Sequence, residues 1–124
     1  MARPKVYVTR VIPKEGIDLL KKHCDVEVNR EDRPLTREEL LKNVRGQDGV
    51  VSLLTDRIDS EVYEIARGIK GFANYAVGFD NIDVGEATRR KIPISNTPGV
   101  LTDATAEMAW ALLFSVVRRV VESD

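Results

Sequence analysis

The sequence predicts an α/β fold with a parallel sheet, on three observations. Short apolar runs recur about every 20 to 24 residues, as strands do when helices separate them. Between the runs, apolar residues take helical spacing. The run Gly49–Leu54 is apolar almost throughout, which is typical of a central parallel strand covered on both faces. Strands that alternate with helices form parallel sheets with right-handed crossovers.

The first strand–helix–strand unit lies before residue 29. We expect strands at Val6–Val8 and Val26–Val28, with an amphipathic helix from Lys14 to about His23 between them. Pro13 precedes this helix, where its missing N–H costs little. Cys24 is the single cysteine, so an intrachain disulfide is excluded. Its position favours a buried structural thiol over a nucleophile.

A second helix is predicted after a charged surface loop at residues 30–35. Thr36 and Glu39 have the spacing of a capping box, in which each residue bonds the other's backbone at a helix start. Gly46 is placed to end this helix in a left-handed conformation.

The second half of the chain continues the alternation. Asp59 is expected to cap the third helix, and Asp56, Arg57 and Asp59 together to form a solvated turn. The remaining elements are a strand at Phe72–Tyr75, a helix at Asp83–Arg90 and a strand at Ile92–Ile94. Asp83 lies three residues before Glu86, the capping-box spacing that starts a helix. Pro93 lacks an N–H donor, so the last strand is placed at a sheet edge.

Five strands and four intervening helices favour a doubly wound, flavodoxin-like sheet with the strand order 2-1-3-4-5. We assign residues 1–101 to this domain. Residues 102–124 are expected to form a hinge and an apolar helix.

The final segment is predicted to be one long apolar helix, from Asp103 to about Val121, with Thr102 as its cap. It has almost no polar face before Arg118, and a helix that is apolar all round must be buried all round. One small domain covers only one side. We therefore expect a homodimer or higher oligomer through helix 103–121.

The composition excludes several classes of function. The 124 residues carry a net charge of −1, which gives no electrostatic basis for binding nucleic acid or an acidic membrane. No apolar stretch approaches the roughly 20 residues of a membrane span, and no signal peptide is visible. Histidine and cysteine lack metal-ligand spacing. A soluble, cytoplasmic protein is expected, without a metal site.

Three segments after predicted strands could contact a ligand, because open α/β sheets bind ligands at the carboxyl ends of their strands. They are Leu54–Thr55, Ala76–Gly78 and Asn96–Thr102. The small side chains of Ala76, Val77 and Gly78 leave main-chain N–H groups accessible, which suits a small anion such as a carboxylate. The alternative is that Gly78 only lets the backbone turn.

The residues show a possible binding edge and no catalytic apparatus. None of the eight glycines forms a dinucleotide fingerprint or a Walker loop. The single histidine, His23, is expected at the end of the first helix, remote from the candidate loops. No proton-transfer pair is apparent, so no catalytic residue is assigned in this chain.

Two long motifs carry a family resemblance. The segments Asn74–Asp83 (NYAVGFDNID) and Asn96–Glu107 (NTPGVLTDATAE), with Val8–Pro13 before them, resemble the amino-terminal part of D-isomer-specific 2-hydroxyacid dehydrogenases. The glyoxylate and hydroxypyruvate reductases are the most similar branch. The resemblance covers essentially the whole chain.

The resemblance implies a flavodoxin-like substrate domain, completed by a helix that returns from the carboxyl terminus of the longer protein. A Rossmann domain inserted between them binds NAD(P)H. The N–H groups of Val77 and Gly78 would hold the carboxylate of a small 2-keto or 2-hydroxy acid, with Leu54 and Thr55 lining the pocket. Thr102 would lie near the nicotinamide, and the helix after it would cross to the Rossmann domain and the dimer interface.

The sequence departs from this family in lacking the glycine-rich loop and the catalytic Arg, Glu and His. A fragment, a proteolysed remnant or an engineered half is expected, inactive by itself, and no cofactor should bind it alone. The alternative is a stand-alone or engineered flavodoxin-like scaffold without catalysis. A phosphate-binding response-regulator-like domain is disfavoured because the first strand–helix loop lacks an acidic pair.

Overall fold

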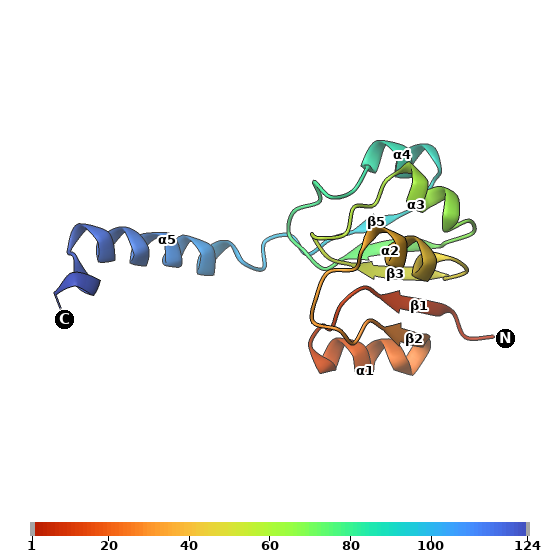
Figure 1. Cartoon of the computed structure of the whole chain (residues 1–124), viewed down its shortest axis with the longest axis horizontal. Helices are drawn as coiled ribbons and strands as arrows, with labels where there is room; N and C mark the ends of the chain where they lie inside the picture. The colour runs from red at the N-terminus through yellow and green to blue at the C-terminus, as the bar shows by residue number, and fades with distance from the viewer. Residues whose placement is uncertain (1, 124) are drawn as a thin grey trace.

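The computed structural model describes residues 2–123 and contains one sheet of five parallel strands (Figure 1). Its order is β2-β1-β3-β4-β5, as predicted. The strands are β1 (Lys5–Val8), β2 (Asp25–Val28), β3 (Gly49–Ser52), β4 (Gly71–Asn74) and β5 (Ile94–Ser95). The helices are α1 (Lys14–His23), α2 (Arg37–Val44), α3 (Ser60–Ile65), α4 (Val84–Arg89) and α5 (Thr102–Val117), followed by the 3-10 turn η1 (Val120–Glu122).

Most helix starts follow the predicted capping chemistry. Thr36 and Glu39 form the full capping box of α2. The side chains of Asp59 and Asp83 accept hydrogen bonds from the N–H groups of Val62 and Glu86 at the starts of α3 and α4. Gly46, just after α2, has a φ of 74°, the left-handed conformation expected of it.

The main core lies between one face of the sheet and helices α2, α3 and α4. Strand residues that point to this face are Tyr7, Val50 and Phe72, all at most 3% exposed. They pack with a larger group from the helices and loops: Leu40, Val44, Ile58, Val62, Tyr63, Ala66, Ile69, Ile82 and Ala87. Tyr63 and Phe72 meet edge to face with ring centroids 5.6 Å apart.

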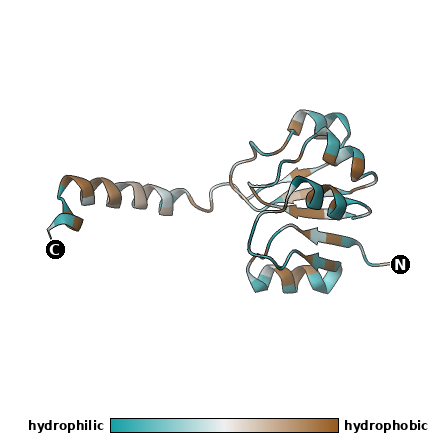
Figure 2. Ribbon diagram, viewed as in Figure 1, coloured by the Kyte–Doolittle hydropathy of each residue, from teal (hydrophilic) through white to brown (hydrophobic). Residues whose placement is uncertain are grey.

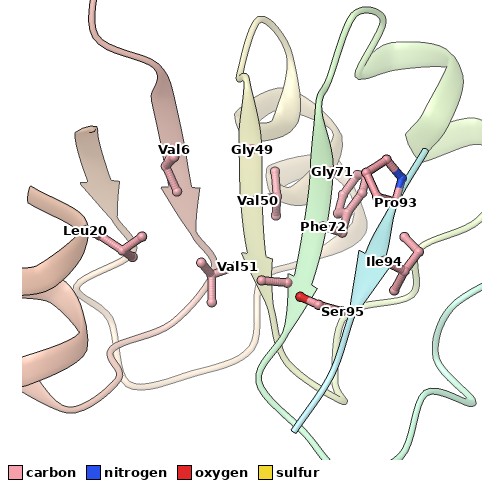
Figure 3. Close-up of a pocket in the computed structure, with 11 residues that line it drawn as sticks. Val6, Leu20, Gly49, Val50, Val51, Gly71, Phe72, Pro93, Ile94 and Ser95 are labelled. Atoms are coloured by element: carbon pink, nitrogen blue, oxygen red, sulfur yellow. The ribbon is translucent and has the colours of Figure 1, made fainter. Parts of the chain in front are cut away.

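The opposite face of the sheet is only partly covered, which corrects the expectation that the central strands are covered on both faces. Here α1 contributes Ile17 and Leu20 over β1 and β2, and β3 to β5 carry no helix from residues 2–123. The result is a shallow apolar groove (Figure 3). Val51 is half-buried and Ala73 is exposed in it, so β4 has a solvated face that the sequence did not predict.

Several element ends differ from the predictions. β3 stops at Ser52, so Leu54 lies in a turn and is 58% exposed. β5 begins after Pro93, at the sheet edge where its missing N–H was expected to place it. Cys24 is half-buried rather than buried. His23 ends α1 and is exposed, as predicted.

The carboxyl-terminal helix is shorter than predicted. α5 has 16 residues and ends at Val117, because Arg119 takes a left-handed conformation with a φ of 52° and η1 follows. The prediction of one long helix to Val121 is therefore wrong. Thr102 is the first helical residue and not the cap; Leu101 occupies that position without a side-chain hydrogen bond. Within residues 2–123, no helix combines the length and apolar character that a membrane crossing requires.

α5 extends away from the sheet and meets none of the other helices (Figure 1). Its residues are exposed except for Ser115, although most of them are apolar (Figure 2). Trp110 and Phe114 stack on each other on its surface, with ring centroids 5.8 Å apart.

Candidate functional site

Two loops meet at the carboxyl edge of the sheet, the edge from which α5 extends (Figure 1). The β3–α3 loop comprises residues 53–59 and the β4–α4 loop residues 75–83. Parallel pairing of β3 with β4, Ser52 opposite Asn74, places the two loop starts side by side. The strand order therefore brings together the segments that contain Leu54–Thr55 and Ala76–Gly78.

Leu54 and Gly78 are neighbours in space. A Cβ atom on Gly78 would lie 3.9 Å from Cδ2 of Leu54, an ordinary van der Waals distance. Gly78 does not have a positive φ, so its backbone conformation is open to other residues. The turn at this position therefore does not require glycine for a left-handed conformation. Thr55 is exposed one residue beyond Leu54.

The main-chain N–H groups of Val77 and Gly78 have no hydrogen-bond acceptor among residues 2–123. The neighbouring N–H of Ala76 donates to the carbonyl oxygen of Asn74 at 2.8 Å. Val77 is 38% exposed and Gly78 is half-buried, so both groups are near solvent. Successive free N–H groups of this kind form a site for a small anion.

The segment after β5 closes one side of this loop. The N–H of Thr97 donates to the carbonyl oxygen of Ala76 at 2.9 Å, and Nδ2 of Asn96 donates to that of Val77 at 2.8 Å. A small hollow lies between the two segments, with mostly apolar walls from Tyr75, Ala76, Val77, Thr97, Val100 and Leu101. Thr102 is exposed at the start of α5, beyond this hollow.

A buried polar network underlies both loops, and sequence reasoning missed it. Asp56 is only 3% exposed, which corrects its assignment to a solvated turn. Its Oδ2 atom accepts hydrogen bonds from Oγ1 of Thr9 at 2.5 Å and from the N–H of Leu53 at 2.8 Å. Ser52 and Asn74 are also buried, and Oγ of Ser52 donates to Oδ1 of Asn74 at 2.9 Å. The sequence did contain a signal for this network. A polar residue ends each of the two strands, at a position where the side chain points to the core face.

The far end of the β3–α3 loop is held by Arg37 of α2. Its guanidinium donates to the carbonyl oxygen of Arg57 at 2.8 Å and to Oδ1 of Asp59 at 2.6 Å. Burial alone would raise the pKa of Asp59, but the hydrogen bonds from Arg37 and from the N–H of Val62 outweigh it, and the pKa is lowered. Asp59 therefore stays ionised, and the loop is fixed at both ends.

A family model for the D-isomer specific 2-hydroxyacid dehydrogenase catalytic domain matches residues 6–122. The chain belongs to this family. It is 57% identical to the glyoxylate reductase of Thermococcus kodakarensis over 98% of its own length and 37% of that relative's. The chain thus spans little more than a third of the curated relatives it matches.

Solved structures agree with this family at the level of the fold. A Thermus thermophilus protein superposes with a TM-score of 0.86 at 43% identity, covering 96% of this chain and 38% of that one. An NADPH-dependent glyoxylate/hydroxypyruvate reductase from Sinorhizobium meliloti, solved with NADP and malonate, gives a TM-score of 0.69 at 24% identity, covering 92% and 34%. At that identity the likeness concerns the fold alone.

A dinucleotide-binding fingerprint is absent from the sequence. Members of the family bind NAD(P). The eight glycines here form no G-x-G-x-x-G sequence, and the free N–H groups at Val77 and Gly78 follow a strand without opening a long helix.

Proposed function

We propose that this chain is the substrate-binding part of an NAD(P)H-dependent 2-hydroxyacid dehydrogenase that acts on glyoxylate or hydroxypyruvate. The observation that carries the proposal is the pair of free N–H groups at Val77 and Gly78, beside Leu54 at the carboxyl edge of the sheet. The glyoxylate reductase identity of the relatives supports the choice of substrate.

In this proposal the two N–H groups donate to the carboxylate oxygens of the substrate. Leu54 covers its apolar side, and Thr55 and Ala76 complete the wall. Main-chain donors held by a rigid loop lose little entropy on binding, so they orient the substrate for attack on its adjacent carbonyl carbon. The nicotinamide supplies or accepts the hydride when the cofactor is bound to the longer protein.

No residue of the described site is assigned a proton-transfer role. The nearest buried carboxylate, Asp56, already accepts two hydrogen bonds on the core side of its loop. We therefore assign this chain to binding and orientation, and the acid–base step to parts of the longer protein. Residues 1–101 would form the substrate unit and residues 102–124 the hinge and crossing helix, with Thr102 near the nicotinamide.

We further propose that α5 packs against α5 of a second copy. Trp110, Phe114 and Leu113 are each at least half exposed, and leaving such side chains in water forgoes roughly 1.5–3 kcal/mol each. A contiguous apolar surface of this kind is typical of an interface. A scaffold without catalysis would also use this helix, so the carboxylate site is what distinguishes the two functions.

The test is an amide NMR titration with glyoxylate, with glycolaldehyde as a control of similar size that lacks the carboxylate. Two N–H donors without a partner cation should give roughly millimolar affinity, near −4 kcal/mol. Resonances of Val77 and Gly78 should shift with glyoxylate and stay still with glycolaldehyde. Unchanged Val77 and Gly78 resonances at tens of millimolar glyoxylate would contradict the proposal.

A further inference from the structure

Among residues 2–123, Asn81 of the β4–α4 loop is the one residue of that loop whose side chain hydrogen-bonds the β3–α3 loop. Its Nδ2 atom donates to the carbonyl oxygens of Leu53 at 3.0 Å and Asp56 at 2.9 Å. Its Oδ1 atom accepts from Nδ2 of Asn74 at 3.1 Å. An asparagine amide nitrogen has two donor hydrogens, and in Asn81 the two shortest donated bonds go to these two carbonyl oxygens, with Oδ1 of Asn74 farther away at 3.3 Å.

Asn74 extends this link to the free N–H groups. It is 2% exposed, and its Nδ2 atom also donates to the carbonyl oxygen of Gly78 at 3.0 Å. The main chain adds parallel ties: the N–H of Ile58 donates to the carbonyl oxygen of Asn81 at 2.9 Å, and that of Tyr75 to Ser52 at 2.7 Å. The hydrogen bond that the carbonyl oxygen of Gly78 accepts restricts the peptide plane on the carboxyl side of Gly78, next to its free N–H.

We propose that Asn81 is a positioning residue for the carboxylate site. It sets the distance between Leu54 on one loop and the N–H groups of Val77 and Gly78 on the other, by holding Leu53 and, through Asn74, Gly78. It does not touch the substrate. This inference rests on the proposed function for the ligand and on the hydrogen bonds for the geometry.

Removing the link leaves buried polar groups without partners. Asn81→Ala deprives the carbonyl oxygens of Leu53 and Asp56 and the amide of Asn74 of one bond each. Such groups recover their hydrogen bonds by moving toward water, since an unmade buried bond is costly. The two loops should then move apart, and the N–H groups of Val77 and Gly78 should no longer point toward the same position.

The experiment compares Asn81→Ala and Asn81→Asp with Asn43→Ala as the matched control. Asn43 also uses its amide in a partly buried hydrogen bond, to Oη of Tyr7 at 3.0 Å, but it belongs to α2. The isosteric Asp fills the same space and cannot donate to the carbonyls. If Asn81 acts by donating hydrogen bonds, Asn81→Asp should give the same result as Asn81→Ala. If Asn81 only fills space, Asn81→Asp should behave like the wild type.

Two readouts are taken. Without ligand, the amide resonances of Val77 and Gly78 should move in both Asn81 variants and stay in place in Asn43→Ala. With glyoxylate, the dissociation constant should rise at least about fivefold in the Asn81 variants, because one lost bond of about 1 kcal/mol corresponds to that factor. Urea unfolding gives the free energy of unfolding of each variant, so that a general loss of stability can be distinguished from a change in glyoxylate affinity.

Each result decides one question. Unmoved Val77 and Gly78 resonances in Asn81→Ala, or wild-type affinity in Asn81→Asp, would overturn the positioning role. If glyoxylate fails to shift these resonances in the wild type, the proposed function fails, while the ligand-free shifts still test the geometry. If Asn81→Ala does not fold, Asn81→Asp replaces it in the ligand-free measurement, and unmoved Val77 and Gly78 resonances in that variant would overturn the role.

Discussion

Asn74 and Asn81 exchange hydrogen bonds through their side-chain amides. Nδ2 of Asn74 lies 3.1 Å from Oδ1 of Asn81, and Nδ2 of Asn81 lies 3.3 Å from Oδ1 of Asn74. Asn74 ends strand β4 and Asn81 precedes helix α4, so the pair closes the β4–α4 loop on itself. Asn74 is buried and Asn81 is half-buried, and we expect this pair to restrict the conformation of the residues between them.

Asp56→Ala should lower the free energy of unfolding by about 2–4 kcal/mol, because it leaves Oγ1 of Thr9 and the N–H of Leu53 without their acceptor. Asp80→Ala is the control, since Asp80 is exposed on the neighbouring loop. It should change the value by at most about 0.5 kcal/mol. Urea unfolding monitored by circular dichroism measures both, and equal losses would refute the structural role of Asp56.

Gly78→Ala should fold with a stability within about 0.5 kcal/mol of wild type, because the added Cβ meets Leu54 at an ordinary distance and the φ is unstrained. The same change at Gly46, where φ is 74°, should cost about 1–2 kcal/mol. Gly78→Ala should nevertheless weaken glyoxylate binding, since the methyl group enters the space beside Leu54. Thermal unfolding and titration together check this, and unchanged affinity would argue against a ligand at Gly78.

Acid should destabilise the protein partly through Glu39. The hydrogen bond from Arg33 and those with Thr36 lower the pKa of Glu39 from 4.5 to about 2. Because the folded pKa is depressed, this stabilisation is present above about pH 4.5 and is lost as the pH falls toward 2. Arg33→Ala should move the NMR titration midpoint of Glu39 toward 4.5. A midpoint that remains near 2 would mean that Arg33 is not the main cause.

Trp110→Asp should break the proposed association through α5. The carboxylate introduced at position 110 would have no partner of opposite charge in an apolar interface, and the cost of burying it would oppose association. Light scattering on a sizing column should give a dimer or larger assembly for the wild type and a smaller species, or precipitation, for the variant. Glu107→Gln is a control on the same helix. A wild-type monomer of 13.9 kDa at high concentration would contradict the proposal.

Much of the fold follows from local sequence signals. The capping box at Thr36, the caps at Asp59 and Asp83, and the edge position of the Pro93 strand are each fixed by a few neighbouring residues. The strand order followed from the regular alternation of strands and helices. The caps depend on side chains within about one helical turn of each other, and the edge position of the last strand depends on the missing N–H of Pro93.

The polar network could not be predicted in the same way. Asp56 and Asn81 are 25 residues apart, and each has the composition of a surface turn. Parallel pairing of β3 with β4 brings them together, so their contact and the burial of Asp56 are tertiary effects. The exposed face of β4 likewise depends on what packs against it, which local periodicity does not report. The end of α5 at Val117 follows from the left-handed conformation of Arg119, which the apolar pattern of residues 116–121 does not indicate.

We propose that the N–H groups of Val77 and Gly78 hold a substrate carboxylate, and a crystal structure of the chain soaked with glyoxylate is the decisive measurement. We expect a carboxylate whose oxygens lie about 2.7–3.2 Å from the nitrogens of Val77 and Gly78, with Leu54 against its other side. Glyoxylate bound at another surface, with both nitrogens bonded only to water, would contradict it.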